Sequence, residues 1–217
     1  MWDTEAEKRE RAAFVLSLRH DAIQDVAVLR AMERVPRALF VEPALRALAY
    51  ENVALPIVCG QTMSQPGVVA AMTQALSIAP RHRVLEVGTG SGYHASVLSC
   101  LAGEVITLER YRSLLGQAQI RFDVLGLRTV SAVFADGLLG LAARAPFDRI
   151  LLTGAVREVP RMLVSQLHPD GILVAPVGEA DGVQTLTRFT RTSAGLTATA
   201  LLRVRFAPLM PGTAAVM

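Results

Sequence analysis

Apolar residues in the first part of the chain recur every three or four positions, the spacing of an amphipathic helix. Between residues 5 and 48 they are Phe14, Leu18, Val26, Leu29, Met32, Leu39 and Leu45. Pro36 and Pro43 interrupt this pattern, since proline removes a helical hydrogen bond and clashes with the preceding turn, so we expect two or three short helices. The next segment, 52–66, predicts an ordered loop, and a helical pattern resumes over 67–76. The loop is indicated by the close spacing of Pro56, Gly60 and Pro66.

From residue 83 onward, apolar runs of strand length alternate with helical stretches. The runs are VLEV, VITLE, TVSAVFAD, FDRILLTG and GILVAPVG, and the helical stretches are 94–101, 112–125 and 160–167. Such alternation is typical of an α/β fold with a mostly parallel, doubly wound sheet. The last segment alternates polar and apolar residues around a Ser-Ala-Gly turn at 193–195, which predicts antiparallel C-terminal strands.

Composition limits the class of protein. Of the 217 residues, 52% are hydrophobic and 19% are charged, which favours one compact globular domain over a disordered chain. The net charge of +3 comes from scattered basic residues, which gives little reason to expect nucleic acid as a partner. No uninterrupted apolar stretch reaches the length of about 18 residues that predicts a membrane span. The N-terminus alternates acids and bases without the apolar core of a signal peptide, so we expect a cytoplasmic protein.

Cysteine and histidine do not form a metal-binding pattern. The two cysteines lie far apart, and no pair of histidines has the helical spacing of a metal site. These residues are Cys59, Cys100, His20, His82, His94 and His168. We therefore expect no metal and reduced thiols. Cys59 has no histidine nearby in sequence to activate it, so a packed thiol is favoured over a nucleophile.

The sharpest motif is a strand that runs directly into alternating glycines, Gly88, Gly90 and Gly92. Glycines here allow the backbone to approach a ligand closely, and the first strand-to-helix turn of a doubly wound sheet is where nucleotide-like ligands bind. A dinucleotide fingerprint would need glycine at Tyr93, and a phosphate loop would need Lys-Ser or Lys-Thr after the glycines. Neither is present, so the motif favours a nucleoside ligand without a pyrophosphate.

Three acids follow successive predicted strands and predict one crevice. Glu86 suits a ligand with a cationic end, Glu109 can accept the hydrogens of two ribose hydroxyls, and Asp136 before Gly137 can accept from an adenine amino group. S-adenosylmethionine has all three features. Each residue alone also fits a simpler interpretation, a tight turn for the glycines and a solvated strand end for Glu109. Their order along the chain favours the cofactor.

The segment 55–66, LPIVCGQTMSQP, resembles the signature loop of protein-L-isoaspartate O-methyltransferases. The resemblance covers nearly the whole chain, in the family's order, with further matching segments at 25–41, 84–93, 145–150, 171–178 and 204–209. It implies a Rossmann-like methyltransferase that uses S-adenosylmethionine, needs no metal, and methylates the carboxylate of isoaspartyl residues in damaged proteins, which initiates repair. The product would be S-adenosylhomocysteine. We expect the enzyme to be a monomer that uses neither nucleic acid nor membrane.

The resemblance also implies roles for individual residues. Ser64 would sit beside the transferred methyl group and hold the substrate carboxylate, Thr62 would be a loop contact, and Arg205 and Phe206 would line the peptide groove. The cofactor would be held by Glu86, Gly88, Thr89, Gly90, Glu109, Arg110, Asp136, Gly137 and Thr153. Alternatives remain for two of these. Ser64 could be a turn or capping serine, and Arg205 could simply pack its aliphatic stem.

Departures from the family pattern concern substrate preference. Val58 and Cys59 stand where glycine and often histidine are usual, Gly67 follows the proline in place of an aromatic residue, Ala135 replaces a glycine, and 153–157 is less alanine-rich. They leave open a related enzyme for a specific peptide or small-molecule carboxylate, or a non-catalytic module that binds S-adenosylmethionine. The expected organisation is a single methyltransferase domain. Its parts would be a helical extension (1–50), the signature loop (51–66) and a cofactor-binding core with the hairpin (67–217).

Overall fold

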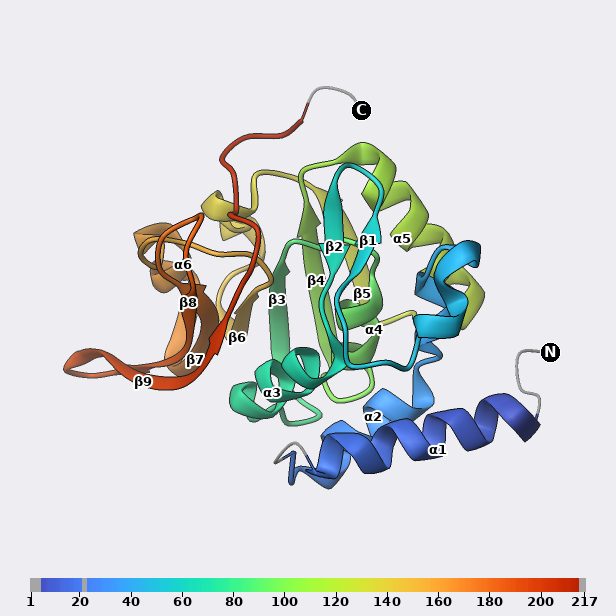
Figure 1. Cartoon of the computed structure of the whole chain (residues 1–217). Helices are drawn as coiled ribbons and strands as arrows, with labels where there is room; N and C mark the ends of the chain where they lie inside the picture. Colours follow the sequence, from blue (N-terminus) through green and yellow to red (C-terminus); the bar gives the residue numbers. More distant parts are fainter. Residues whose placement is uncertain (1–4, 21–22, 215–217) are drawn as a thin grey trace.

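The computed structural model describes residues 5–20 and 23–214 (Figure 1). The N-terminal region forms two α-helices, α1 (Glu5–His20) and α2 (Val26–Arg34), followed by two 3-10 helices, η1 (Arg37–Phe40) and η2 (Pro43–Leu48). The region is helical, as expected, but its described residues form four helical segments in place of the two or three short helices predicted, and α1 is 16 residues long. Asp25 caps α2, because its carboxylate accepts from the backbone N–H groups of Ala27 and Val28.

The segment 52–66 was expected to be a loop, and that prediction is wrong in part. It contains a short antiparallel hairpin of β1 (Leu55–Ile57) and β2 (Gln61–Met63), in which Leu55 pairs with Met63. Both of these side chains are buried, which fixes the register. The turn passes through Cys59 and Gly60 with φ values of 61° and 63°. The prolines and glycine that indicated a loop therefore flank and turn a hairpin.

The core is a seven-stranded sheet in the order β5-β4-β3-β6-β7-β8-β9. The first five strands of this order run parallel, and β8 and β9 are antiparallel, as predicted. The strands are β3 (Arg83–Val87), β4 (Glu104–Glu109), β5 (Val130–Phe134), β6 (Phe147–Leu152), β7 (Leu167–Val177), β8 (Gln184–Thr192) and β9 (Gly195–Val204). The helices between them are α3 (Pro66–Leu76), α4 (Tyr93–Ser99), α5 (Arg112–Leu125) and α6 (Arg161–Gln166). Short 3-10 turns η3 (Gly137–Leu139) and η4 (Ala142–Arg144) precede β6.

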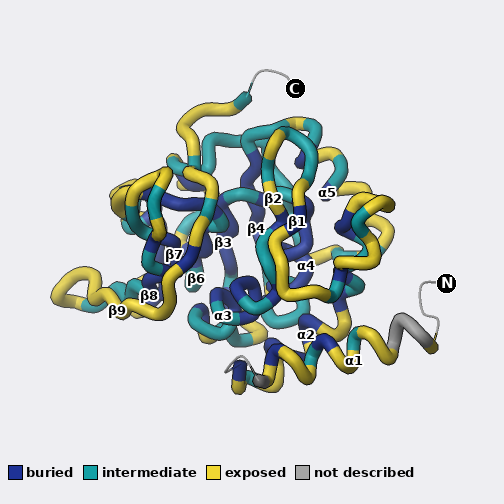
Figure 2. The backbone as a smooth tube through the Cα atoms, in the orientation of Figure 1, coloured by how far each residue is buried: buried dark blue, intermediate teal, exposed yellow. Residues whose placement is uncertain are grey.

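Helices cover both faces of this sheet, so it is doubly wound. On one face, α3, α4 and α5 pack against alternate strand residues, and on the other, Leu163 of α6 packs with Leu85, Ile106 and Ile150. The central strands are buried on both sides, which explains their continuous apolar runs. Figure 2 shows the contrast with β9, which is exposed along nearly its whole length at the edge of the sheet.

The N-terminal helices form a third layer that positions the hairpin. Their apolar side chains pack with β1, β2, α3 and α4 in one buried cluster, which includes Met32, Phe40, Met63 and Tyr93. The hairpin is thereby held in front of the sheet, near the glycine turn that precedes α4 (Figure 1). Across the described residues, 5–20 and 23–214, no helix is both long and apolar enough to cross a membrane.

Candidate active site

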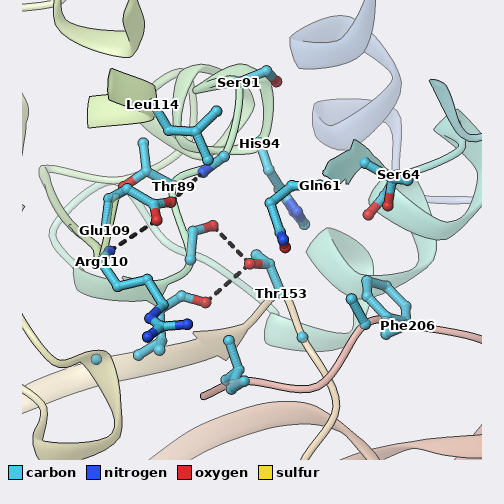
Figure 3. A pocket seen from close by; sticks show the side chains of 18 of the residues that line it. Gln61, Ser64, Thr89, Ser91, His94, Glu109, Arg110, Leu114, Thr153 and Phe206 are labelled. Atoms are coloured by element: carbon cyan, nitrogen blue, oxygen red, sulfur yellow. Dashed lines mark hydrogen bonds between the residues drawn. The ribbon is translucent and has the colours of Figure 1, made fainter. Parts of the chain in front are cut away.

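A crevice of about 1030 Å³, including its open mouth, lies at the carboxyl ends of the parallel strands. Its walls come from the signature hairpin, the glycine turn, the ends of β4 and β6, the turn η3 and the segment after β9. In Figure 3, Glu109 and Arg110 lie at one end, Ser64 and Phe206 lie at the other, and Thr153 lies between them. The lining includes ten of the predicted site residues: Thr62, Ser64, Gly88, Thr89, Gly90, Glu109, Arg110, Gly137, Thr153 and Phe206.

The glycine turn has a backbone that only glycine adopts easily. Gly88 and Gly90 have φ values of 97° and 53°, and a Cβ on Gly88 would lie 2.3 Å from the Thr153 hydroxyl oxygen. That hydroxyl is hydrogen-bonded to the carbonyls of Val87 and Gly88, at 2.9 and 2.6 Å (Figure 3). The end of β6 thus holds the turn against the crevice floor.

Glu109 connects the turn to the next strand. One carboxylate oxygen accepts from the backbone N–H of Gly90 at 2.9 Å. The other accepts from the backbone N–H groups of Arg110 at 2.8 Å and Tyr111 at 3.0 Å. The side chain lines the crevice and is only 5% exposed. Since a carboxylate has about four acceptor positions, about one is left for a ligand.

Glu86 is fully buried and does not line the crevice. One of its carboxyl oxygens accepts from the Thr107 hydroxyl at 2.5 Å, and the other has no hydrogen-bond partner. The Thr107 hydroxyl lies 2.6 Å from that of Thr89, which does line the crevice. A short chain of polar groups therefore connects the buried acid to the crevice wall.

Burial raises the pKa of Glu86 from 4.5 to about 8, and the charge of Glu109 contributes in the same direction. The folded protein therefore holds a proton on Glu86 that the unfolded chain releases above about pH 4.5. The unfolded state binds fewer protons than the folded state between these values, so this group lowers the free energy of unfolding as pH rises from about 4.5 to about 8.

Asp136 bonds to the C-terminal segment, which we define as residues 205–214. Its carboxylate accepts from the backbone N–H of Leu138 at 2.9 Å and of Gly212 at 2.7 Å. Arg110 donates from Nε to the Gly212 carbonyl at 3.2 Å, and its own carbonyl accepts from the backbone N–H of Ala214 at 2.9 Å. The C-terminal segment thus crosses the adenosine end of the predicted site, and Asp136 itself does not line the crevice.

The signature loop brings Ser64 to the other end of the crevice. Helix α3 begins at Pro66, and the residue at its N-cap is Gln65, without a side-chain capping bond. Ser64 is therefore not the capping residue of this helix. The backbone of the loop is fixed from two sides: the Ser64 carbonyl accepts from Arg37, and the Gly67 N–H donates to the Asn52 side chain at 2.8 Å.

Several lining residues were not predicted from the sequence. His94 is buried in α4, and its Nε2 lies 2.9 Å from the Thr73 hydroxyl. Burial lowers the pKa of His94 to about 3, so it is neutral at physiological pH. Leu138 follows the Asp-Gly pair, a signal that the sequence did contain, whereas only the fold brings the backbone of 207–210 to the crevice. Arg205 is exposed and lies outside the lining.

The described residues contain no group of three or more His, Cys, Asp or Glu side chains that could hold a metal ion. The side chain of His20 lies outside the described residues. Cys59 is half-buried with its sulfur 3.1 Å from the Ser113 hydroxyl, as a packed thiol would be. The polar side chains that line the crevice include Gln61, Glu109 and Arg110, together with the neutral imidazole of His94.

Known proteins resemble the chain along its length. The family model "Protein-L-isoaspartate(D-aspartate) O-methyltransferase" matches residues 9–214. A protein-L-isoaspartate O-methyltransferase of Azorhizobium caulinodans is 59% identical over 217 residues, 100% of both chains. One from Xanthobacter autotrophicus is 59% identical over 215 residues, 99% of this chain and 98% of the relative. A solved protein-L-isoaspartate O-methyltransferase superposes with a TM-score of 0.82 at 27% identity, covering 91% of this chain and 65% of that longer chain.

Proposed function

The chain belongs to the protein-L-isoaspartate(D-aspartate) O-methyltransferase family, and from that premise we propose how its crevice works. The enzyme is an S-adenosylmethionine-dependent methyltransferase that acts on the carboxylate of isoaspartyl residues. We propose that the cofactor lies between Glu109 and Ser64, with its nucleoside at the first and its methyl group near the second. The single observation that carries this proposal is that one crevice contains both the glycine turn and the signature loop.

The residues present suit this cofactor. Gly88, Gly90 and Gly137 line the crevice, so the wall there is backbone. At Gly88 and Gly137 the protein leaves no space for a side chain, because a Cβ would lie 2.3 Å from Thr153 or 2.4 Å from Val87. Glu109 keeps about one acceptor position for a ribose hydroxyl. Glu86 lies behind the turn and is connected to the crevice wall through the hydroxyls of Thr107 and Thr89. Because its raised pKa keeps it mostly protonated at neutral pH, it does not supply a full negative charge to the ligand. When bound, S-adenosylmethionine supplies an electrophilic methyl group on a sulfonium sulfur.

In the proposed mechanism, this chain orients the acceptor rather than activating it chemically. A carboxylate with an ordinary pKa of about 4 is ionised at neutral pH, so its attack needs no general base. Ser64 would donate a hydrogen bond that holds one carboxylate oxygen in line with the methyl group. Thr62 and Phe206 would contact the peptide at the mouth of the crevice, and Arg205 would contact it outside the crevice. Orientation of this kind can contribute about 7 to 11 kcal/mol of a barrier.

Methyl transfer from labelled cofactor to a matched pair of peptides tests the proposal. One peptide carries an isoaspartyl residue and the other an aspartyl residue in the same sequence. We expect label only in the isoaspartyl peptide. Label in neither peptide, with normal S-adenosylhomocysteine binding, would favour a non-catalytic module or an enzyme for a different carboxylate.

We also propose a monomeric, cytoplasmic enzyme that recognises damaged proteins without nucleic acid or membrane. Support comes from the free thiols Cys59 and Cys100, which suit a reducing compartment, and from the scattered basic residues. The three segments 1–50, 51–66 and 67–217 would act as one domain, since the N-terminal helices pack on the signature hairpin. Size-exclusion chromatography with light scattering and cell fractionation test these points.

A further inference from the structure

A buried arginine without a carboxylate partner lies directly behind the signature loop. Arg37 is fully buried at the start of η1, and its guanidinium donates to the carbonyls of Ala49 at 2.5 Å, Val53 at 3.2 Å and Ser64 at 3.0 Å. Its Nε has no hydrogen-bond partner. Carbonyl groups satisfy donors but carry no net charge, so the positive charge stays uncompensated.

The surroundings of Arg37 confirm that it is a buried cation. Among residues 5–20 and 23–214, no ion pair joins it to an acid, and the titratable groups that face it are Tyr93 and Tyr50. The guanidinium carbon lies 5.7 Å from the centre of the Tyr93 ring. Burial lowers the pKa of Arg37, but arginine stays protonated in proteins. A buried charge without an opposite charge beside it is costly, so an anion bound nearby would be stabilised by it.

We infer that Arg37 makes the acceptor site selective for a negatively charged group, by placing an uncompensated positive charge behind the residue that holds the substrate carboxylate. The guanidinium donates to the carbonyl of Ser64, and the same residue lines the crevice. Arg37 does not touch the substrate, so it is a positioning and specificity-determining residue. This inference rests on the proposed function, which assigns the carboxylate to Ser64.

The size of the effect follows from Coulomb's law. A carboxylate at Ser64 would lie about 8 Å from the guanidinium, a hydrogen bond plus roughly one residue away. At that separation and an effective dielectric constant of about 20 to 30, a unit charge changes affinity about ten- to thirtyfold. A neutral ligand of the same shape would not gain this factor.

The test compares two isosteric peptides, one with an isoaspartyl carboxylate and one with the corresponding neutral isoasparaginyl amide. Their dissociation constants are measured by calorimetry on the S-adenosylhomocysteine complex, and the ratio of amide to carboxylate constants isolates the charge. We expect R37Q to lower this ratio about ten- to thirtyfold. The matched control is N52A, which removes the uncharged tie to Gly67 on the same loop and should weaken both peptides equally.

A ratio in R37Q equal to that of the wild type would overturn the inference, because it would leave Arg37 as a purely structural tie. If R37Q does not fold, R37K at pH 6 decides. The R37K variant keeps the positive charge but not the forked geometry of the guanidinium. A wild-type ratio of amide to carboxylate dissociation constants in R37K therefore supports the inference, and a ratio near one overturns it. Failure of the proposed function is distinguishable, because the wild-type enzyme would then leave the isoaspartyl peptide unmethylated.

Discussion

Removing the Glu109 carboxylate tests the cofactor site most directly. The Glu109→Ala substitution deletes a group with three backbone hydrogen bonds, to Gly90, Arg110 and Tyr111, and one remaining acceptor position. If that position accepts a hydrogen bond from a ribose hydroxyl, the substitution removes one charge-assisted hydrogen bond to the ligand. It does not remove two, because the other three acceptor positions of the carboxylate already bind backbone N–H groups. Such a bond contributes about 1.5 to 3 kcal/mol. We therefore expect S-adenosylhomocysteine to bind about 10 to 150 times more weakly.

Isothermal titration calorimetry measures this effect, and Glu104→Ala is the matched control. Glu104 lies at the other end of the same strand, where it pairs with Arg83 and Arg144 near the surface. Such surface pairs contribute little, so the control should bind the ligand within about twofold of the wild type. Thermal melts of both variants separate a local loss of ligand contact from unfolding of the turn.

Two results would refute the reasoning. Binding of Glu109→Ala within about twofold of the wild type would show that the ribose assignment is wrong. Equal weakening in Glu104→Ala would show that the loss arises from the strand as a whole and not from the crevice end.

Three further outcomes are expected. Ser64→Ala should lower kcat for an isoaspartyl peptide about tenfold or more, with little change in S-adenosylhomocysteine affinity or melting temperature; a lower melting temperature with normal turnover would return Ser64 to a structural role. Glu86→Gln should be more stable than the wild type at pH 8 and about equally stable at pH 5, because the wild type loses stability as its unfolded state releases the Glu86 proton, whereas glutamine does not titrate. An equal difference in melting temperature between the two proteins at both pH values would contradict the raised pKa. Treatment with a chelator should leave turnover unchanged, and a loss restored by one divalent ion would disprove a metal-free transfer.

Much of this architecture follows from the sequence because its signals are local. A strand that ends in Gly88 and Gly90 specifies a close backbone approach, and strand-length apolar runs separated by helical stretches specify a parallel sheet. Parallel strands carry their carboxyl ends to one edge, so the position of Glu109 at the end of a strand predicts that it lies in the crevice. The resemblance of the loop that contains Ser64 predicted which end of the crevice accepts the substrate, and the structure places that loop in the crevice wall.

Other features depend on which helices and strands pack together, and no local sequence signal specifies that packing. Glu86 lies on a strand covered on both faces, so its burial and raised pKa depend on the docking of helices far along the chain. Asp136 meets Gly212 across 76 residues, where the C-terminal segment folds back over the sheet edge. Arg37 meets the Ser64 carbonyl across 27 residues. The sequence determines which side chains can carry a charge. The local dielectric and the hydrogen-bond partners that set the effect of that charge are determined by the tertiary packing of the helices and the sheet.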